Sequence, residues 1–192
     1  MEYEGAEAKL YPVRIAGKRM LIKRREPKGY RIAELDNEIR EGRTRREARI
    51  TIKLRQLGAN VPAIIAIGRF SIWMEKIDGK LLAKLPRAKR FYELAGKQLA
   101  LMHSHDVIHG DFTPANIIVS GKKVFVIDFG LAEQNPDPEG KAIDLLLMKR
   151  SLPPGIYSAF EKSYIASGGH KSTLSALRKI ELRGRYQKRT LG

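Results

Sequence analysis

The segment 109–130, HGDFTPANIIVSGKKVFVIDFG, gathers polar side chains around short apolar runs. Asp111 precedes Asn116 by five residues, and Asp128 stands directly before Phe-Gly. The runs NIIVS and VFVID are joined by GKK, so they predict a β-hairpin that brings these oxygen-bearing side chains to one end of a sheet. Hard cations such as Mg²⁺ bind carboxylate and amide oxygens together with substrate phosphates. A metal held by Asn116 and Asp128, with Asp111 beside it to accept a proton, is typical of phosphoryl transfer.

Taken without Asp128, the pair Asp111 and Asn116 has a simpler interpretation. Two polar residues at this spacing on a loop most often form turns. The distant Asp128 is what favours chemistry over a turn.

Two further charges fall on faces that should be buried. The runs Lys9–Ile15 and Arg19–Arg24 predict a hairpin, in which strand alternation points Lys23 to the same side as apolar residues. A lysine is poorly placed there without a partner. Glu47 lies on the apolar stripe of a helix expected over residues 35–57.

The other expected elements divide the chain into two parts. Strands AIIAI and FSIWM follow the first helix, and the strand-rich part ends near Ile77. A helix is expected from Pro86 to about His105, and the 109–130 hairpin follows it. Three more helices are expected in AIDLLLMKR, GIYSAFEKSYIA and STLSALRKIELR. The pattern predicts an α+β protein with domains at residues 1–77 and 78–192.

Composition limits the classes of function. The 192 residues include no cysteine, which excludes disulfides and thiolate metal sites. No run is long and apolar enough for a membrane span and no secretion signal opens the chain, so we expect a cytoplasmic protein without membrane contact. The net charge of +16 favours a polyanionic partner, although a solubilising surface or adaptation to heat would also produce it.

The pattern HGDxxxxN followed by IDFG resembles the catalytic and metal-binding loops of the protein-kinase superfamily. The resemblance implies a minimal bilobal kinase-like fold with a small β-rich N-lobe and a reduced, mostly helical C-lobe. It makes Asp111 the catalytic base and Asn116 and Asp128 the metal ligands. We expect His109 to pack behind the loop.

The same resemblance extends to other kinase parts. Lys23 matches the lysine that pairs with the α- and β-phosphates, and Glu47 matches its ion-pair partner; a purely structural salt bridge is the alternative. The stretch IWMEKIDG resembles a kinase hinge, in which the backbone at Glu75 and Ile77 would hold adenine. Near the N-terminus, Gly5 and Ala6 occupy the place of the phosphate-covering loop.

Several features depart from signalling kinases. The glycine-rich motif G-x-G-x-x-G is missing, and Gly110 stands where those kinases usually carry Arg. No APE triplet follows DFG, and the C-terminal part is too short for the usual peptide-docking helices. A site built this way has little with which to select a protein substrate, so water or a tethered hydroxyl is a plausible phosphoryl acceptor.

These departures fit one family. The runs EGAEA, IKRREPKGYR, RTRREAR, HGDFTPANIIV, DFGLAE, KAIDL and RGR resemble the small atypical Ser/Thr kinase/ATPase subunit of the KEOPS complex, a Rio-like family also described as p53-related kinases. An archaeal origin fits the minimal length. The resemblance implies an ATP- and Mg²⁺-dependent enzyme, with Mn²⁺ as an alternative metal, that acts chiefly as an ATPase. The complex makes the threonylcarbamoyl modification of the adenosine next to the tRNA anticodon.

The resemblance also implies partners. The C-lobe would meet the threonylcarbamoyl-transferase subunit, and a small adaptor subunit would bind elsewhere. The basic surface and C-terminal tail would contact tRNA. We expect four basic residues of the tail either to contact tRNA or to reach back toward the nucleotide: Arg183, Arg185, Lys188 and Arg189. Two alternatives stay open: a small-molecule phosphotransferase of the aminoglycoside or choline kinase kind, and a kinase-fold scaffold for tRNA binding.

Overall fold

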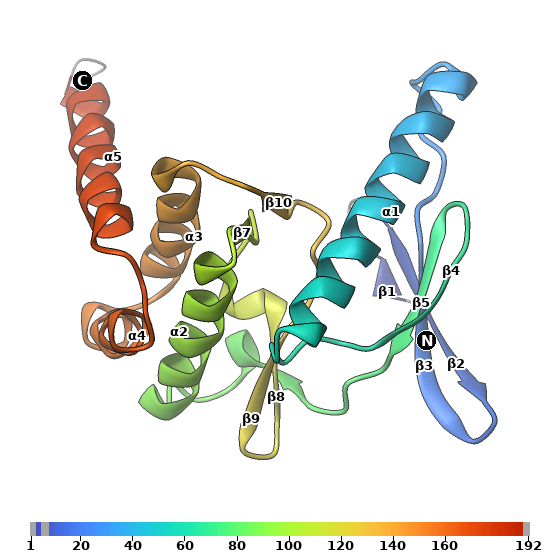
Figure 1. The fold of residues 1–192 in the computed structure, drawn as a ribbon, viewed down its shortest axis with the longest axis horizontal. Helices are drawn as coiled ribbons and strands as arrows, with labels where there is room; N and C mark the ends of the chain where they lie inside the picture. The colour runs from blue at the N-terminus through green and yellow to red at the C-terminus, as the bar shows by residue number, and fades with distance from the viewer. Residues whose placement is uncertain (1–2, 5–7, 190–192) are drawn as a thin grey trace. The chain divides into compact units, whose positions relative to one another are not determined.

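The computed structural model describes the backbone of residues 3–4 and 8–189, and the side chains of residues 8–183. The chain forms two compact units (Figure 1). The N-terminal unit runs up to Asp78 and includes the later segment Ile127–Gly130. The C-terminal unit contains Gly79–Val126 and the chain from Leu131 onward. The four residues around Asp128 thus belong with the sheet of the first unit, although the hairpin that leads to them belongs to the second.

The N-terminal unit is built on a five-stranded antiparallel sheet with strand order β1-β2-β3-β5-β4. Ala16 and Gly17, both with positive φ, form the tight turn of the central hairpin, as hairpin turns of this kind require. The strands are β1 (Tyr3–Glu4), β2 (Lys9–Ile15), β3 (Lys18–Arg24), β4 (Ile64–Ile67) and β5 (Ser71–Glu75).

Helix α1 (Ala33–Gln56) packs against β4 and β5. Its buried stripe includes Ile50 and Leu54, and Glu47 lies on the same stripe, as the sequence predicted. Acidic residues occupy the first turn and basic residues the last turn, which suits the helix dipole. The helix ends before Gly58, whose φ of +86° is the left-handed conformation that glycine adopts readily.

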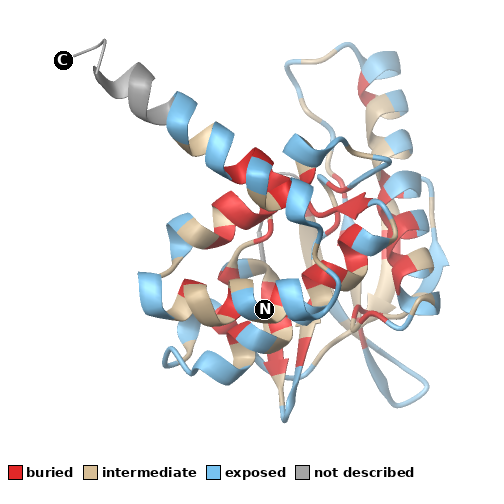
Figure 2. Cartoon of the chain, turned by 60° about the vertical axis from the view of Figure 1, so that its left-hand side comes forward, coloured by how far each residue is buried: buried red, intermediate tan, exposed pale blue. Residues whose placement is uncertain are grey.

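The C-terminal unit centres on two packed helices, α2 (Lys89–Ser104) and α4 (Pro154–Ala166). Helix α3 (Pro138–Ser151) packs against α5 (Lys171–Arg189) and α4. Buried residues, red in Figure 2, line the inward faces of these helices. The largest fully buried side chains of this unit are those of Tyr92, Tyr164, Phe112, Phe160, Leu82, Leu99, Met102 and Ile117.

Two small sheets complete this unit. One has strand order β6-β8-β9, formed by β6 (Lys80–Leu81), β8 (Ile117–Ser120) and β9 (Lys123–Val126). The other pairs β7 (Val107–Ile108) with β10 (Glu133–Gln134). Two 3₁₀ turns, η1 (Leu82–Lys84) and η2 (Pro114–Asn116), flank the first sheet.

Most expected elements are present, but α3 begins earlier than the sequence analysis expected. It starts at Pro138 instead of Ala142 because Asp137 caps it: the Gly140 amide donates to the Asp137 side chain over 2.7 Å. Proline is also favourable at a first helical position. Across the described residues, no helix is both long and apolar enough to cross a membrane.

Candidate active site

Lys23, on β3 of the N-terminal unit, makes two ion pairs there. Its ammonium lies 2.7 Å from Glu47 Oε1 on α1 and 2.6 Å from Asp128 Oδ1. The Lys23 and Glu47 side chains are only 9% and 4% exposed, whereas Asp128 is 53% exposed. The buried Glu47 carboxylate therefore holds Lys23 in position. The Asp128 carboxylate is accessible, so a ligand can approach Lys23 from that side.

Arg25 is a member of this cluster that the sequence analysis missed. Its guanidinium is buried and its Nη2 atom lies 2.8 Å from Glu47 Oε2. The available signal was weak: Arg25 follows Lys23 by two residues, as strand alternation would require, but it lies directly past the end of β3. Glu47 thus neutralises two buried cations, one with each oxygen.

Asp128 sits in a backbone conformation that holds its carboxylate in place. Its φ is +64°, which non-glycine residues rarely adopt but which Asp and Asn tolerate best. The Gly130 amide donates to Asp128 Oδ1 over 3.2 Å. The turn and this hydrogen bond together orient the carboxylate toward Lys23.

Asp111 and Asn116 lie together in the C-terminal unit. The Asn116 amide nitrogen donates to the Asp111 carbonyl and to Asp111 Oδ2, both over 2.8 Å. Both N–H groups of Asn116 are thereby used, and its Oδ1 accepts no hydrogen bond from the residues that the structure describes. That oxygen is a suitable ligand for a hard cation, and the Asp111 carboxylate keeps a defined orientation.

The loop that carries Asp111 is anchored from below by Asp144 on α3. Asp144 is fully buried and accepts hydrogen bonds from the backbone amides of His109 (2.7 Å) and Gly110 (2.9 Å). His109 is also fully buried, and its Nδ1 accepts from the Asp111 amide over 3.2 Å. His109 therefore packs behind the loop, as expected, and its ring helps to hold the backbone of Asp111.

His103 on α2 completes this anchor. Its Nε2 lies 3.2 Å from Asp144 Oδ2 and its Nδ1 lies 2.9 Å from the Tyr164 hydroxyl. A carboxylate only accepts, so Nε2 carries the proton and Nδ1 accepts from Tyr164. Burial lowers the pKa of His103, outweighing the opposite effect of Asp144, and the ring is held neutral. Neither His103 nor Asp144 was predicted to have a role, although an aspartate inside the apolar run AIDLLL was a signal.

Gly110 has a structural reason for departing from signalling kinases. Its φ is +80°, and a Cβ there would lie 2.4 Å from the Leu131 carbonyl oxygen. A side chain of any kind would push that backbone away. The arginine found in signalling kinases therefore has no room in this loop.

The expected adenine contacts at the backbone of Glu75 and Ile77 stay predictions. The Glu75 amide already donates to the Ala63 carbonyl over 2.8 Å, so it is not available to a base. The Ile77 amide donates no backbone hydrogen bond within the described chain. The expected phosphate contacts at Gly5 and Ala6 lie outside the described residues.

Within the described residues, no group of three or more His, Cys, Asp or Glu side chains could hold a metal ion by itself. Where Mg²⁺ binds with a nucleotide, it usually takes one or two protein oxygens and several phosphate oxygens. The Asn116 amide oxygen and the accessible Asp128 carboxylate are the kinds of ligand such an ion takes, so these residues fit Mg²⁺ in their chemistry.

Comparison with known proteins decides the family. A model of the RIO domain matches residues 16–148. The chain belongs to the RIO-domain family. This member is 36% identical to the KEOPS complex subunit Bud32 of Pyrococcus abyssi, over 97% of its own length and 96% of that protein. It is 34% identical to a probable serine/threonine-protein kinase BUD32 homolog of Archaeoglobus fulgidus, over 88% and 90% of the two chains. The resemblance to the small KEOPS kinase subunits, and with it the phosphotransferase class, is confirmed.

Some relatives of this RIO-domain chain are longer. It is 34% identical to a probable bifunctional tRNA threonylcarbamoyladenosine biosynthesis protein of Methanobrevibacter smithii, where 95% of the chain covers only 36% of the relative. The chain thus spans about a third of that protein.

Solved structures confirm the kinase-like α+β fold. The Rio2 kinase of Chaetomium thermophilum, solved as an ADP/Mg²⁺-phosphoaspartate complex, has a TM-score of 0.63 at 19% identity, covering 98% of this chain and 70% of that one. A macrolide 2′-phosphotransferase of Brachybacterium faecium has a TM-score of 0.68 at 14% identity, and the match covers 94% of this chain and 81% of that one. At these identities the likeness concerns the fold alone.

Proposed function

We propose that this chain binds ATP with Mg²⁺ and acts mainly as an ATPase within a tRNA-modifying assembly, where it supports threonylcarbamoylation of the adenosine beside the anticodon. The observation that carries the proposal is the buried ion cluster of Lys23, Glu47 and Arg25, with the accessible Asp128 at its edge. A purely structural salt bridge would not need an exposed third carboxylate in a strained turn. The names of the relatives supply the assembly and its product.

Each residue has a distinct task in this proposal. Lys23, held in position by Glu47, would bind the α- and β-phosphates. Asp128 and the Asn116 amide oxygen would hold Mg²⁺, which neutralises charge that develops on the phosphates. Asp111, oriented by its hydrogen bond from Asn116, would accept the proton of the attacking water or hydroxyl. Ile77 would offer its backbone amide to adenine.

Water is the acceptor that the proposal favours, with protein Ser/Thr as a minor one. Helix α3 begins at Pro138, soon after Gly130, so little chain remains to form an activation loop. Beyond α3, the described part of the chain forms the helices α4 and α5. An acceptor that needs no docking surface is therefore the simplest choice.

The proposed partners are the threonylcarbamoyl-transferase subunit on the C-terminal unit, a small adaptor subunit, and tRNA. Helix α5 presents the basic residues expected to meet tRNA. Of these, Arg183 forms an ion pair with Glu139, and the side chains beyond it lie outside the described part of the chain.

The test is ATP hydrolysis by the purified full chain, alone and with transferase subunit and tRNA. We expect slow hydrolysis alone, clear stimulation by the partners, and loss of most turnover in Asp111→Asn with nucleotide binding retained. Stimulation by an aminoglycoside or choline, but not by the partners, would support a small-molecule phosphotransferase instead. Unchanged turnover in Asp111→Asn would reject the proton-acceptor role.

A further inference from the structure

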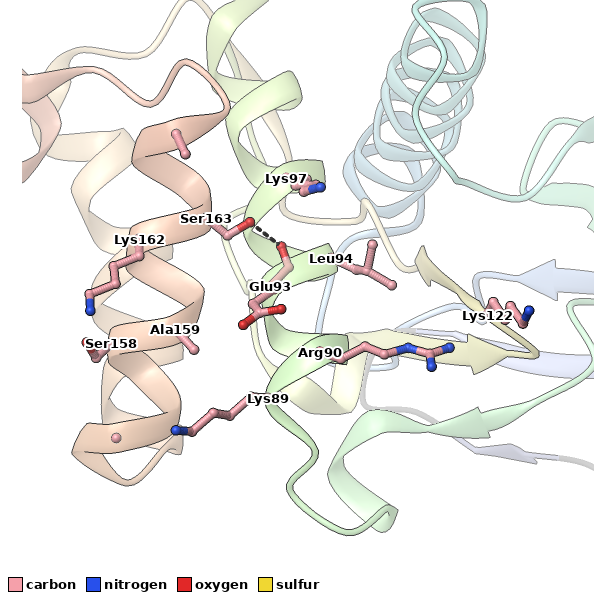
Figure 3. Close-up of a pocket in the computed structure, with 12 residues that line it drawn as sticks. Lys89, Arg90, Glu93, Leu94, Lys97, Lys122, Ser158, Ala159, Lys162 and Ser163 are labelled. Atoms are coloured by element: carbon pink, nitrogen blue, oxygen red, sulfur yellow. Dashed lines mark hydrogen bonds between the residues drawn. The ribbon is translucent and has the colours of Figure 1, made fainter.

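A basic groove lies on the C-terminal unit, and none of the residues described above as catalytic lines it. Its volume is about 780 Å³, and it runs between α2, α4 and the turn that joins β8 to β9 (Figure 3). Five cations and one acid line it: Lys89, Arg90, Lys97, Lys122, Lys162 and Glu93. The proposed ATPase chemistry uses none of them.

The groove cations are not neutralised by the protein. Many other cations of this unit have acidic partners, for example Lys141 with Asp106 and Lys149 with Glu181. None of the five groove cations forms an ion pair with an acid among residues 8–183. Their positive charge therefore remains available for an external anion.

The groove is long rather than compact. Lys89 and Lys97 are eight residues apart on α2, and at 1.5 Å per residue they are separated by about 12 Å along the helix. In Figure 3, Lys162 projects from α4 on one side of α2, while Lys122 lies on the opposite side. Cations spread in this way do not converge on one point, so they suit a chain of anionic groups better than a single phosphate.

The floor of the groove is open and fixed. Small residues of α4, among them Gly155, Ser158 and Ala159, line it and leave space between the lysines. The Ser163 hydroxyl donates to the Glu93 carbonyl over 2.8 Å and ties α4 to α2 (Figure 3). This hydrogen bond links the two helices that line the groove.

We propose that this groove binds the sugar–phosphate backbone of RNA. Four of its five cations are lysines, which are depleted at protein–protein interfaces, and Leu94 is the sole large apolar residue lining it. An acidic protein would need aromatic or aliphatic anchors that this surface lacks. Phosphate chains are bound by dispersed cations in this manner, and the net charge of +16 assists their approach.

The inference rests on the proposed role in tRNA modification, because that role supplies the RNA. It adds a second RNA-binding surface to the one proposed for the basic tail on α5. The groove would position RNA without reading its sequence, since phosphate contacts fix register but carry no base information.

The test compares two triple charge reversals in the full chain. The groove variant is Lys89→Glu with Lys97→Glu and Lys162→Glu. The matched control is Lys18→Glu with Arg46→Glu and Arg49→Glu, three exposed cations of the N-terminal unit that have no acidic partner in the described chain. Both change the net charge equally. Binding of a tRNA transcript is followed by fluorescence anisotropy between 50 and 200 mM salt.

We expect the groove variant to bind at least tenfold more weakly and its plot of log K against log salt to flatten by about 2, since each lost phosphate contact removes roughly 0.7 to 0.9. The control variant should keep most of its affinity for tRNA and most of the salt slope. Equal losses in the two variants, or an unchanged slope in the groove variant, would overturn the proposal. Competition by poly-glutamate as strong as that by RNA would also overturn it, in favour of an acidic protein.

ATP hydrolysis without RNA separates this proposal from the proposed function. It should be unchanged in the groove variant, because the groove residues touch none of the proposed catalytic groups. If the protein hydrolyses ATP but the groove variant binds RNA as the parent does, only the RNA-binding role of the groove is contradicted. If the protein binds RNA through the groove but does not hydrolyse ATP, only the ATPase function is contradicted.

Discussion

Glu47 divides its carboxylate between two cations, with Lys23 at 2.7 Å and Arg25 at 2.8 Å. All three side chains are buried, so the arrangement depends on complete pairing. Arg25 Nε is itself buried without a hydrogen-bond partner among the described residues, which makes the contact with Glu47 more important to it. If Glu47 is neutralised, Lys23 still has an ion pair with Asp128. Arg25 has no second acidic partner in the described cluster.

The first prediction concerns this carboxylate. Glu47→Gln should lower the free energy of unfolding by about 3 kcal/mol, because removing one partner leaves buried charge uncompensated. The double variant Arg25→Met with Glu47→Gln should recover part of that stability but not ATP affinity. Urea unfolding and fluorescent-nucleotide binding measure the two effects. A loss below about 0.5 kcal/mol, the size of an ordinary surface change, would show that the cluster is not tightly coupled.

His103 acts through Asp144 rather than on a substrate. Asp144 holds two backbone amides of the catalytic loop, and His103 donates to the same carboxylate. Burial lowers the pKa of His103 below the ordinary value of 6.5, and nearby Lys141 and His170 act in the same direction. Protonation in the folded state is therefore unfavourable, and its cost should appear as a dependence of stability on pH.

The second prediction follows from that pKa. Well above pH 6.5, His103 is neutral in both the folded and the unfolded chain, and its contribution to stability is fully present. As pH falls below 6.5 the unfolded chain takes up a proton that the folded chain resists, so stability is lost at up to about 1.4 kcal/mol per pH unit.

His103→Gln removes the titrating group while its amide can still donate to Asp144 and accept from Tyr164. Urea unfolding at pH 7.5 and 5.5 should show a smaller loss on acidification in this variant than in the parent. The other histidines are common to both proteins and cancel in the comparison. An equal loss in both would mean that His103 does not resist protonation.

At the scale of elements, α2 and α4 approach unusually closely at Gly96. A Cβ there would lie 2.4 Å from the Phe160 carbonyl oxygen and 3.0 Å from the Tyr164 amide nitrogen. Both atoms belong to the backbone of α4, so no side-chain rotation can relieve the clash. The same pair of helices forms the walls of the basic groove and supplies His103 and Tyr164 to the loop anchor.

The third prediction uses two helical glycines. Gly96→Ala should lower the free energy of unfolding by about 1 to 3 kcal/mol because the helices must separate. Gly42→Ala on α1 is the matched control, since a Cβ there meets no atom within 4 Å. The control should be neutral or gain up to about 1 kcal/mol from helix propensity. A loss of unfolding free energy in Gly96→Ala beside no loss in Gly42→Ala would support close packing of α2 against α4. A gain of unfolding free energy in Gly96→Ala would contradict it.

The longer helices and strands could be predicted from the sequence, because the local pattern of apolar residues matches the burial that these residues have in the folded chain. The stripe that placed Glu47 inward and the alternation that placed Lys23 inward both depend on neighbours in the chain. Strands of two residues, such as β7 and β10, have no such pattern, because their pairing depends on distant segments. The start of α3 was missed for a local reason, the cap at Asp137.

At the scale of the whole molecule, the chain contributes its proposed catalytic groups from two units. Lys23, Glu47 and Asp128 belong to the first, and Asp111 and Asn116 to the second. Motif spacing, together with the expected burial of Lys23 and Glu47, selected these residues, and their catalytic roles stay predictions. It did not reveal the contacts of Arg25, Asp144 and His103, because those contacts form only on folding. The large positive charge was evident from composition, but its concentration in a groove without neutralising acids required the structure.

The most direct test of the central claim is ATP binding measured with and without Mg²⁺, for the parent chain and Asp128→Asn. Asparagine tolerates the positive φ of residue 128, so the turn should persist while the metal-binding charge is lost. We predict that Mg²⁺ strengthens ATP binding by the parent at least tenfold and has little effect on the variant. The same Mg²⁺ dependence in both proteins would contradict the account.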